Sequence, residues 1–554
     1  MRTSLVLVFA LIASLVYVTG DAGAEAPQPV EIQILNVSDW HAQLDPLSVS
    51  GVNVGGAAAI SAHWQQDRAA NPNTLTLTAG DAYGAAPPLS GFFDEVPAVL
   101  AMRLMGFDAD TFGNHNFDRG IDHLQEMIDL AAAPPGAQPG TPFQYVSANL
   151  RNVEDNLTGV KPFEMFDVGG VNVAVIGITN PEAPTLVFPG SFGTIEVTDP
   201  VPAANRARAA ARRAGANFFV AITHLGVTGF HPDTGEATGP LIDFAENVGG
   251  FDVIFGDHTD VQFSGVIGNA LVVENRSKGL TYARLNLSVD PANGRVISRS
   301  VEFVTPLTDA VTPDPAIVEM LAPFRAALAE AFDGVIGVAT DLFVRGGNIE
   351  RRQEVAIGNL ITDAMRVRYG TQLGFTNGGG IRAPLPSSYL PIDTTLRRNT
   401  PGYAPGPPFD LVVGDVFETL PFGNSAITRE VTGQLLWAML ENGVSQVNPD
   451  GTAADGRFPQ VSGFRFVFDS RLAAGSRVVS VELADGTPVP PDGTVYTLAT
   501  NDFVNAGGDG YTMLADGQGV TREVMADVVL EHITGLGTIT PTLEGRITNL
   551  ATAP

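Results

Sequence analysis

Residues that can bind metal ions or phosphate follow a short β-prone run in the first half of the chain. The segment Gly-Asn-His-Asn-Phe-Asp occupies residues 113–118, after the run at 109–112 and before a helical pattern that begins near Arg119. Asn and His side chains bind metal ions or phosphate, and Asp118 stands three residues after His115, where it can orient the imidazole. Open α/β sheets bind ligands where strands end and helices begin, so we expect a site here.

Similar residues stand at the ends of other predicted strands. The candidates at all these strand ends are Asp39 and His41, Asp81, Asn114 and His115, His224, and His258 and Asp260. One such His alone is as often a hydrogen-bonded structural residue as a ligand. Repeated clusters of Asp, His and Asn, each after an apolar strand, indicate a metal site instead. Ligands of these types, without sulfur, suit Mn, Zn, Fe, Mg or Co.

A pair of metal ions at these strand ends would support hydrolysis. Two divalent ions about 3.5–4 Å apart can bind a phosphate group and a water molecule together, lower the pKa of the water and stabilise charge on the attacked phosphoryl group. His115 would then be free to act as a general acid or to stabilise charge, with Asp118 holding its ring in place.

The elements that must position these residues follow a repeated order of strand, polar tip and helix. We expect strands at 31–37, 74–78, 171–178, 217–222 and 251–255, and helices at 119–133 and 203–214. This order predicts an α/β domain, with layers packed around a mostly buried sheet.

The chain is long enough for more than one domain, with 554 residues of which 44% are hydrophobic. Three prolines at 306–315 mark a linker, and a helical pattern at 317–332 leads into a second half with its own glycine-rich segments. We predict a signal peptide at 1–24, a catalytic domain at 28–305, a linker with a bridging helix at 306–335 and a second domain at 336–552.

The charge of the chain limits its partners. The net charge is -29, which argues against a nucleic-acid polymer as partner, because its phosphates require Lys and Arg. A small phosphorylated substrate remains possible, since a local group of arginines or metal ions is sufficient to bind it. Lys161 and Lys278 are the only lysines, so we expect any side-chain cation on the phosphate to be Arg.

The first residues have the pattern of a secretory signal. Arg2 precedes an apolar stretch at residues 5–18, and Ala22-Gly23-Ala24 is a small-residue cleavage site. The alternative is an uncleaved anchor, but the apolar stretch is short for a membrane span. The chain has no Cys and therefore no disulfide. We expect a periplasmic or secreted protein with no stable membrane insertion after signal removal.

These segments together resemble a known family. The strand-end motifs at 38–41, 80–81, 113–118, 223–224 and 256–260 are similar to the five blocks of calcineurin-like metallophosphoesterases. The second half resembles the C-terminal domain of the 5'-nucleotidase / UDP-sugar hydrolase family through residues 358–364, 377–382, 420–424 and 503–510. The resemblance implies a four-layer α/β/β/α metallophosphoesterase domain followed by a smaller α+β substrate-binding domain.

The resemblance also implies roles for individual residues. One metal ion would be held by Asp39, His41, Asp81 and Asp260, and the other by Asp81, Asn114, His224 and His258. His115 and Asp118 would form the catalytic dyad. Substrate contacts would be Phe422 and Phe503 on the base faces, Asn377 on the base edge, Asp509 on the ribose, and Arg351 and Arg382 on the phosphate. Taken singly, a Phe at a strand edge is more often a core residue than a clamp.

The sequence departs from the family pattern at three positions. Asp260 stands where Gln, Asn or His is more usual, and a further carboxylate there predicts tighter binding of hard divalent ions. Asn116 stands where Glu is common, outside the metal ligands of the family. Asp257 replaces a usual glycine, and we expect it to be a solvated loop carboxylate.

The sequence thus indicates an exported phosphohydrolase with two divalent metal ions, Mn, Zn, Co or Mg, that removes phosphate from nucleoside 5'-monophosphates or related nucleotides by metal-activated water attack. Within the family, the alternatives are a 2',3'-cyclic-nucleotide phosphodiesterase, a UDP-sugar hydrolase or a thiosulfohydrolase, and the aromatic pair favours nucleotides. A non-catalytic exported binding protein is the alternative from another class, and the intact set of ligand residues argues against it. The native metal, the preferred base and the oligomeric state stay open.

Overall fold

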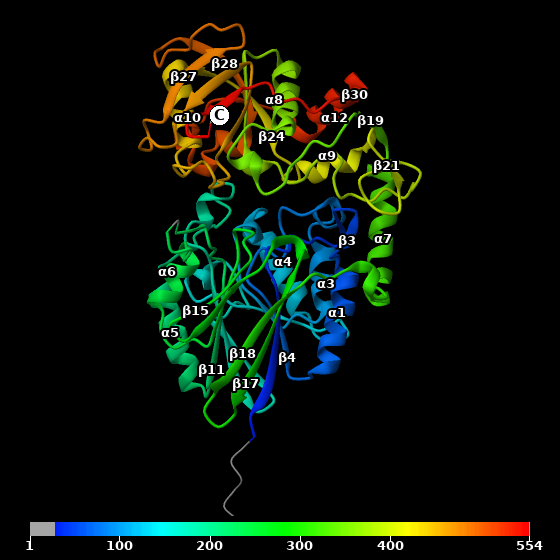
Figure 1. Cartoon of the computed structure of the whole chain (residues 1–554), viewed down its shortest axis with the longest axis vertical. Coiled ribbons are helices and arrows are strands. Elements are labelled where there is room, and N and C mark those ends of the chain that lie inside the picture. The colour runs from blue at the N-terminus through cyan, green and yellow to red at the C-terminus, as the bar shows by residue number, and fades with distance from the viewer. Residues whose placement is uncertain (1–27, 232, 553–554) are drawn as a thin grey trace, which may run out of the picture.

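The fold was analysed in a computed structural model of the chain, which describes residues 28–231 and 233–552 (Figure 1). The predicted signal peptide at 1–24 lies outside the described residues. No helix in the described part of the chain is both long enough and apolar enough to cross a bilayer.

The first domain is built on two six-stranded sheets. The first sheet has the order β18-β17-β1-β4-β5-β6, with parallel pairing from β1 to β6 and antiparallel pairing of β1 with β17 and of β17 with β18. Its strands are β1 (Val30–Val37), β4 (Thr74–Thr78), β5 (Ala109–Asp110), β6 (Gln144–Tyr145), β17 (Tyr282–Asp290) and β18 (Arg295–Val304).

The second sheet has the order β15-β16-β14-β11-β9-β8, and its four central strands run parallel. Its strands are β8 (Phe163–Val168), β9 (Val171–Ile178), β11 (Phe218–Thr223), β14 (Val253–Gly256), β15 (Phe263–Ile267) and β16 (Ala270–Glu274). The strands β9 and β11 are buried along almost their whole length, as expected for parallel strands covered on both faces.

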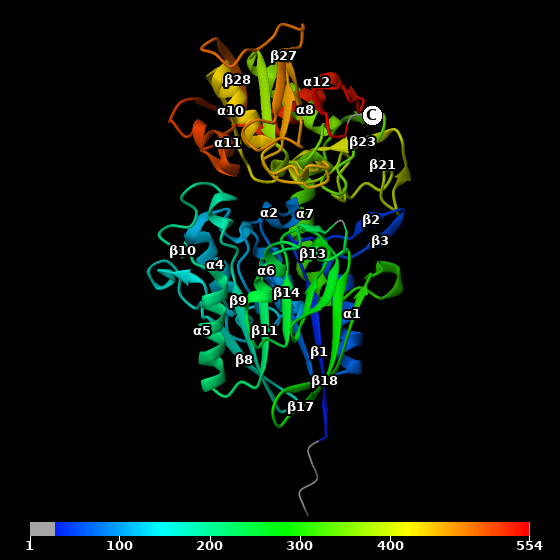
Figure 2. The ribbon, with the colours of Figure 1, turned by 60° about the vertical axis from the view of Figure 1, so that its left-hand side comes forward.

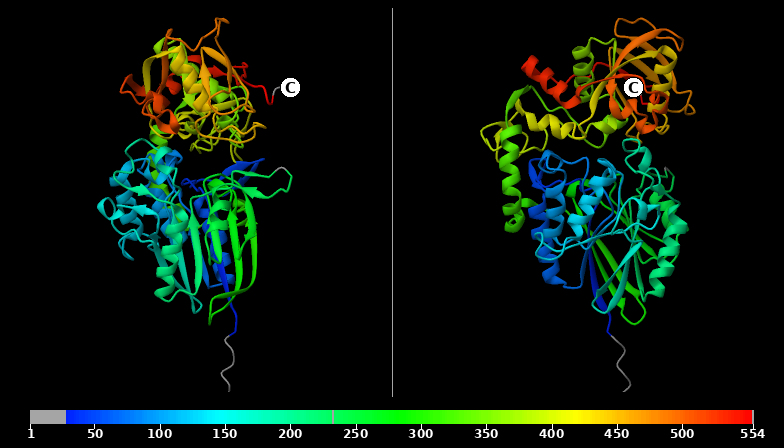
Figure 3. Two further views of the ribbon diagram at one scale, coloured as in Figure 1. Left: turned by 90° about the vertical axis from the view of Figure 1, so that its left-hand side faces the viewer. Right: turned by 180° about the vertical axis from the view of Figure 1, so that it is seen from behind.

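The two sheets pack face to face with helices outside. Ile34 and Leu285 of the first sheet share one buried apolar cluster with Val175, Val220 and Val253 of the second. Helices cover the outer faces, with α1 (Ala57–Ala70), α3 (Val96–Met105) and α4 (Gly120–Ala132) on the first sheet and α5 (Pro200–Arg213) and α6 (Pro240–Asn247) on the second (Figures 1 and 3). This is the predicted four-layer α/β/β/α arrangement.

A long helix, α7 (Pro315–Phe332), leads from the first domain to the second. Its N-cap residue, Asp314, accepts hydrogen bonds from Ala316 N and from Ser61 and Gln65 on α1, which attaches the start of α7 to the first domain. The ring of Phe332 at the other end packs against Phe92 and Phe417.

The second domain is α+β. Its central sheet has the order β25-β20-β28-β24-β29, with α8 (Ala356–Tyr369) and α12 (Met525–Leu536) in one apolar cluster and α10 (Gly433–Gly443) in another. The sheet strands are β20 (Leu373–Asn377), β24 (Ser425–Thr432), β25 (Pro459–Ser462), β28 (Val495–Asn501) and β29 (Val520–Val524).

Two three-stranded sheets complete this domain. They contain β19 (Val335–Ala339), β23 (Phe409–Val412) and β30 (Thr538–Ile539), and β26 (Phe464–Phe468), β27 (Val478–Leu483) and β31 (Ile547–Asn549). Short elements elsewhere are α2 (Pro88–Gly91), α9 (Val413–Thr419), α11 (Asp502–Asn505), β2 (Leu47–Val49), β3 (Val52–Val54), β7 (Leu150–Arg151), β10 (Glu196–Val197), β12 (Gly229–Phe230), β13 (Ala237–Thr238), β21 (Arg397–Arg398) and β22 (Ala404–Pro405).

Candidate active site between the two domains

The carboxyl ends of strands from both sheets of the first domain meet beneath the second domain (Figure 2). Strands β1, β4 and β5 lead into the loops of Asp39, Asp81 and Asn114, and strands β11 and β14 lead into those of His224 and His258. These loops lie far apart in sequence, so the sandwich of two sheets is what brings them together.

The backbone turns sharply at these strand ends. Five of the predicted ligands have positive φ, namely Asp39 (39°), His41 (49°), Asp81 (47°), His258 (86°) and Asp260 (56°). A non-glycine residue in this region is strained by about 1–3 kcal/mol, and such residues cluster at functional sites, where the surrounding structure holds them. The strain here redirects side chains at the ends of strands toward one point.

Two glycines allow the loops to approach each other. A Cβ atom on Gly113 would lie 2.1 Å from Asp81 Oδ1 and 2.6 Å from His224 Cε1. A Cβ atom on Gly80 would lie 2.5 Å from Gly113 N and 2.8 Å from His224 Nδ1. A side chain at Gly113 would therefore displace Asp81 and His224, and one at Gly80 would displace His224 and the Gly113 backbone.

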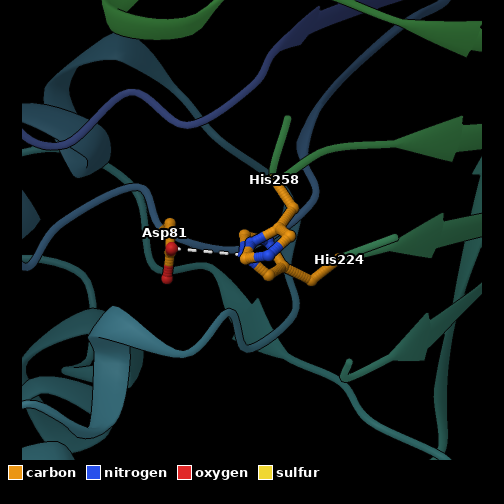
Figure 4. A group of neighbouring side chains, drawn as sticks. All are labelled: Asp81, His224 and His258. Carbon is orange, nitrogen blue, oxygen red and sulfur yellow. Dashed lines mark hydrogen bonds and ion pairs between the residues drawn. The ribbon is translucent and has the colours of Figure 1, made fainter. Parts of the chain in front are cut away.

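Asp81 is at the centre of the site and is only 1% exposed. Its Oδ1 accepts a hydrogen bond of 2.8 Å from His115 N, and its Oδ2 lies 3.1 Å from His224 Nε2. His258 Nδ1 lies 3.1 Å from the same His224 nitrogen (Figure 4). The geometry thus agrees with the prediction that Asp81 lies beside both His258 and the Asn114–His115 loop.

Backbone carbonyls orient two of the imidazole rings. His224 Nδ1 lies 3.1 Å from Ala79 O, and His41 Nδ1 lies 2.9 Å from Gly84 O. A carbonyl accepts only, so each Nδ1 carries the proton and, in the neutral ring, each Nε2 keeps a lone pair. This arrangement is typical of imidazoles that bind metal ions.

Three overlapping groups of side chains in the described part of the chain could each hold a cation, with ligand atoms within 4.8 Å of one another. The groups are Asp81, His224 and His258; Asp39, His41 and Asp81; and Asp39, His224 and Asp257. Asp39 Oδ1, Asn114 Oδ1 and Asp257 Oδ2 are buried without a hydrogen-bond partner. Buried carboxylate and amide oxygens need a partner, so these residues fit divalent cations.

The charges of the central pair are coupled. Burial alone would raise the pKa of Asp81, but the neighbouring His224 and His115 outweigh it and lower that pKa. Burial would lower the pKa of His224, and the Asp81 carboxylate instead raises it to about 9. Imidazole binds metal only when it is deprotonated, so metal binding at His224 must displace a proton.

Asp257 and Asp260 differ from what the sequence suggests. The expectation that Asp257 is a solvated carboxylate is wrong, because the residue is 1% exposed. It directly follows β14, and its amide donates to Leu225 O, which holds it inside the site. Asp260 has a side chain that is 26% exposed, and its Oδ1 accepts bonds of 2.8 and 2.9 Å from Ser277 N and Oγ. It belongs to none of the three groups, and its role as a ligand stays a prediction.

The predicted dyad is assembled within one turn. His115 Nδ1 lies 2.9 Å from Asp118 Oδ2 and 3.1 Å from Oδ1, across the 3-10 turn His115–Phe117. The ring of His115 meets that of His41 edge-on, with centroids 5.3 Å apart. Asp118 therefore orients a partly exposed imidazole beside the candidate metal ligands.

Residues of the second domain lie against this site. The ring of Phe422 stacks on His115 at a centroid distance of 5.6 Å, and Arg382 Nη2 lies 3.4 Å from His41 Nε2. The Arg382 guanidinium carbon is 5.8 Å from the Phe422 ring centroid, and Lys278 of the first domain donates to Arg382 O at 3.2 Å. Both domains therefore contribute to a single site.

The other predicted substrate residues form a second cluster in this domain. Asn377 Nδ2 donates to Asp509 Oδ2 at 2.7 Å, and Asp509 is 7% exposed. Burial raises the pKa of Asp509 to about 6. Phe503 lies against Gly508, where a Cβ atom would come within 2.3 Å of its ring. Among the aromatic pairs of the described residues, none joins Phe503 to Phe422.

Comparisons with known proteins agree with both halves of the chain. Residues 335–516 match the family model of the 5'-nucleotidase C-terminal domain. The crystal structure of a 5'-nucleotidase precursor from Thermus thermophilus aligns with a TM-score of 0.79 and 29% identity, over 94% of this chain and 99% of that one. A 5'-nucleotidase of Diplobatis ommata is 27% identical over 95% of this chain and 92% of its own length.

Residues 335–516 belong to the 5'-nucleotidase C-terminal domain family, and the chain as a whole is similar to 5'-nucleotidases. Another relative, Endonuclease YhcR of Bacillus subtilis (strain 168), is 28% identical over 86% of this chain. This chain spans 37% of the length of that protein, and 65% and 35% of the length of two further bacterial relatives. The chain thus spans between about a third and two thirds of the length of these three relatives.

One arginine that the sequence analysis did not single out, Arg345, lies next to the predicted phosphate contact Arg382. Arg345 is partly buried, lies 2.9 Å from Glu350 Oε1 and donates to Ile381 O, beside Arg382. Burial and the charges of Arg351 and Arg345 lower the pKa of Arg382 to about 9. Arg345 and Arg351 thus both lie beside the buried carboxylate of Glu350, and both are close enough to Arg382 for their charges to act on it. Arg345 lies in the loop between β19 and the turn at Ile349–Arg351, where no sequence pattern marks it, so its position is seen only in the structure.

Proposed function

We propose that the protein is an exported phosphohydrolase with two divalent metal ions that removes phosphate from nucleoside 5'-monophosphates. The observation that carries this proposal is the position of Arg382 and Phe422, from the second domain, directly on the His41–His115 face of the Asp81 cluster. A phosphate on the cluster would thus lie beside an arginine, with an aromatic ring close to it.

The residues that would hold the metal ions are Asp39, His41, Asp81, Asn114, His224 and His258, with Asp260 as a further candidate. Bound ions of this type supply an activated water and stabilise charge on the phosphoryl group. Asp81 lies in two of the candidate groups, which suits a bridging ligand. The donor set accommodates Mn, Zn, Co or Mg.

The dyad of His115 and Asp118 would donate a proton or stabilise charge during the reaction. With Nδ1 directed at Asp118, the His115 ring presents Nε2 to the space beside His41 and Phe422. From there it can donate a proton to the leaving nucleoside oxygen or stabilise charge on it. The Asp118 carboxylate holds the ring in this orientation.

The second domain recognises the nucleotide. Arg382, Arg351 and Arg345 surround an anion site, where guanidinium groups bind phosphate oxygens in pairs. Phe422 and Phe503 would stack on the base, Asn377 would contact its edge, and Asp509 would accept hydrogen bonds from the ribose hydroxyls. The acidic chain is unsuited to a nucleic-acid polymer, and the signal pattern at 1–24 supports a periplasmic or secreted location.

A substrate panel tests the proposal. Product release from AMP, 2',3'-cyclic AMP, UDP-glucose and thiosulfate should be measured with Mn, Co, Zn or Mg on the wild type, His115→Ala and, as a matched control, His63→Ala on α1. We expect metal-dependent AMP hydrolysis that falls by roughly 10²–10⁴-fold in His115→Ala and is unchanged in the control. Faster hydrolysis of another substrate in the panel would show that the enzyme acts on that substrate class instead of nucleoside 5'-monophosphates. Absence of hydrolysis of every substrate would overturn the proposal.

A further inference from the structure

The carboxylate of Asp257 lies inside the site with one oxygen unsatisfied. Its Oδ1 accepts a 2.9 Å hydrogen bond from His258 N, whereas Oδ2 is buried and has no hydrogen-bond partner. The residue is 1% exposed. A buried carboxylate oxygen without a partner is costly, because it has lost water and gained nothing in exchange.

The surroundings of Asp257 point to a cation as the missing partner. Its carboxylate forms a group with Asp39 and His224 in which the ligand atoms lie within 4.8 Å of one another. Asp39 Oδ1 is likewise buried without a partner. Two unsatisfied carboxylate oxygens beside one imidazole form an arrangement that a divalent ion would satisfy.

The position of Asp257 is held by the backbone. Asp257 N donates to Leu225 O at 2.9 Å, and Ser38 Oγ donates to Gly256 O at 3.3 Å. These bonds tie the end of β14 to the loops that carry His224 and Asp39. The carboxylate is therefore placed by the same strand ends that place the predicted ligands.

We propose that Asp257 is a further metal ligand, which supplies Oδ2 to the cation bound beside Asp39. The inference rests on the proposed function only in requiring that the site hold divalent cations. With Asp39 and Asp81, it gives the site three carboxylates, and oxygen-rich anionic sites favour hard ions such as Mn²⁺ and Mg²⁺ over Zn²⁺. The carboxylate that sets this preference is then Asp257 rather than Asp260.

Asp243, on the exposed face of α6, provides a control. It is also an aspartate, and it belongs to none of the three candidate metal groups of the described residues. Asp243→Asn makes the same chemical change away from the site. A general effect of the substitution would therefore appear in both variants, whereas loss of ligation would appear only in Asp257→Asn.

The Asn substitution separates ligation from a purely structural role. An asparagine at position 257 keeps a carbonyl oxygen that can accept the bond from His258 N, and it loses the charge on the second oxygen. Asp257→Glu keeps a carboxylate and should restore part of the metal affinity. Thermal unfolding of the metal-free variants checks the fold, and Asp257→Ser replaces Asp257→Asn if the latter does not fold.

The experiment is a titration of the metal-stripped full chain with Mn²⁺ by calorimetry, together with the visible absorption spectrum of the Co²⁺-loaded protein. We expect Asp257→Asn to weaken one of two Mn²⁺ binding events by at least about tenfold and to change the Co²⁺ spectrum, because a ligand is lost. The same variant should lower the ratio of Mn²⁺ to Zn²⁺ affinity, whereas Asp243→Asn should leave both readouts near the wild type.

Two results would overturn the inference while leaving the proposed function intact. One is unchanged Mn²⁺ affinity and Co²⁺ spectrum in Asp257→Asn, and the other is an equal loss in Asp243→Asn. A wild type that binds no divalent ion would overturn both this inference and the proposed function.

Discussion

The candidate metal ligands of the first domain and the candidate nucleotide contacts of the second are held in different ways. The first set stands at strand ends of two packed sheets, and Asp39, Asp81 and His224 are at most 5% exposed. The second set comes from mixed elements, with Asn377 at the end of β20 and Phe503 on the short helix α11. Its two aromatic rings, Phe422 and Phe503, are only partly buried. One domain thus builds its site internally, whereas the other completes a site that lies against its neighbour.

This difference assigns chemistry and recognition to different kinds of structure. Metal ligands must be placed within a few tenths of an ångström, so strained turns backed by rigid sheets suit them. Nucleotide contacts must admit and release a substrate, and partly exposed rings allow this. The domains meet there through single bonds such as the one from Lys278 Nζ to Arg382 O. We expect substitutions in the first set to affect turnover and those in the second to affect mainly affinity.

The largest expected effect is that of Asp81→Asn. The substitution removes the charge that faces His224 and lies in two of the candidate metal groups. We expect kcat/KM for AMP to fall by at least about 10³-fold, roughly 4 kcal/mol of transition-state stabilisation, with weaker binding of both Mn²⁺ ions. Kinetics and Mn²⁺ titration measure this, with Asp122→Asn on the exposed face of α4 as control. A loss of less than about tenfold would show that Asp81 does not bridge.

An intermediate effect is expected for Phe422→Ala. Stacking on a base contributes roughly 1–3 kcal/mol, so KM for AMP should rise by roughly 5- to 150-fold while Phe422→Trp stays near the wild type. Ribose 5-phosphate, which lacks the base, should be hydrolysed equally by the wild type and the Ala variant. Equal losses on both substrates would mean that the Phe422 ring acts through His115, which it contacts. The first domain would then not be the only one whose residues affect turnover.

The smallest effect is a pH dependence at Asp509. Burial raises its pKa to about 6, so the carboxylate becomes protonated as the pH falls through 6 and loses an acceptor for ribose hydroxyls. We expect KM for AMP to rise below about pH 6, and Asp509→Asn should remove this rise. The substrate 2',3'-dideoxy-AMP carries the same phosphate without these hydroxyls, so its KM should be equally pH-dependent in both proteins.

The same pKa shift has a consequence for folding. Because the folded pKa lies above the ordinary value of 3.8, the folded state holds the proton more tightly, and the free energy of unfolding falls as the pH rises from about 4 to about 6. Asp509→Asn should reduce this fall by up to about 3 kcal/mol, measured as the difference between the two urea unfolding series. Parallel series would contradict the burial of this charge.

Much of the site could be predicted because its signals are local. His115 and Asp118 lie in one turn, three residues apart, so their contact follows from the sequence once that turn forms. The strand-end positions of Asp81 and His224 follow from apolar runs that end in polar residues. The four-layer fold likewise follows from repeated strand and helix patterns and from the family resemblance.

Other features could not be predicted because they depend on what covers a residue. Asp257 resembles an exposed loop residue in sequence, but Leu225 and Ser38 close over the end of β14 and bury it. Asp260 faces Ser277, which comes from a turn 17 residues later. Arg345 is held near Arg382 by its contacts with Glu350 and Ile381, which lie elsewhere in the sequence.

The sequence by itself determined which residue types stand at the strand ends, which half of the chain carries the ligands and that the two halves form an α/β and an α+β domain. Only the tertiary structure decided which carboxylates face one another, which are buried and which arginines converge. The physical reason is the sequence separation over which each kind of interaction acts. Periodicity and turn chemistry act between residues close in sequence, whereas burial and charge neutralisation depend on neighbours that the packing of two sheets and two domains brings together.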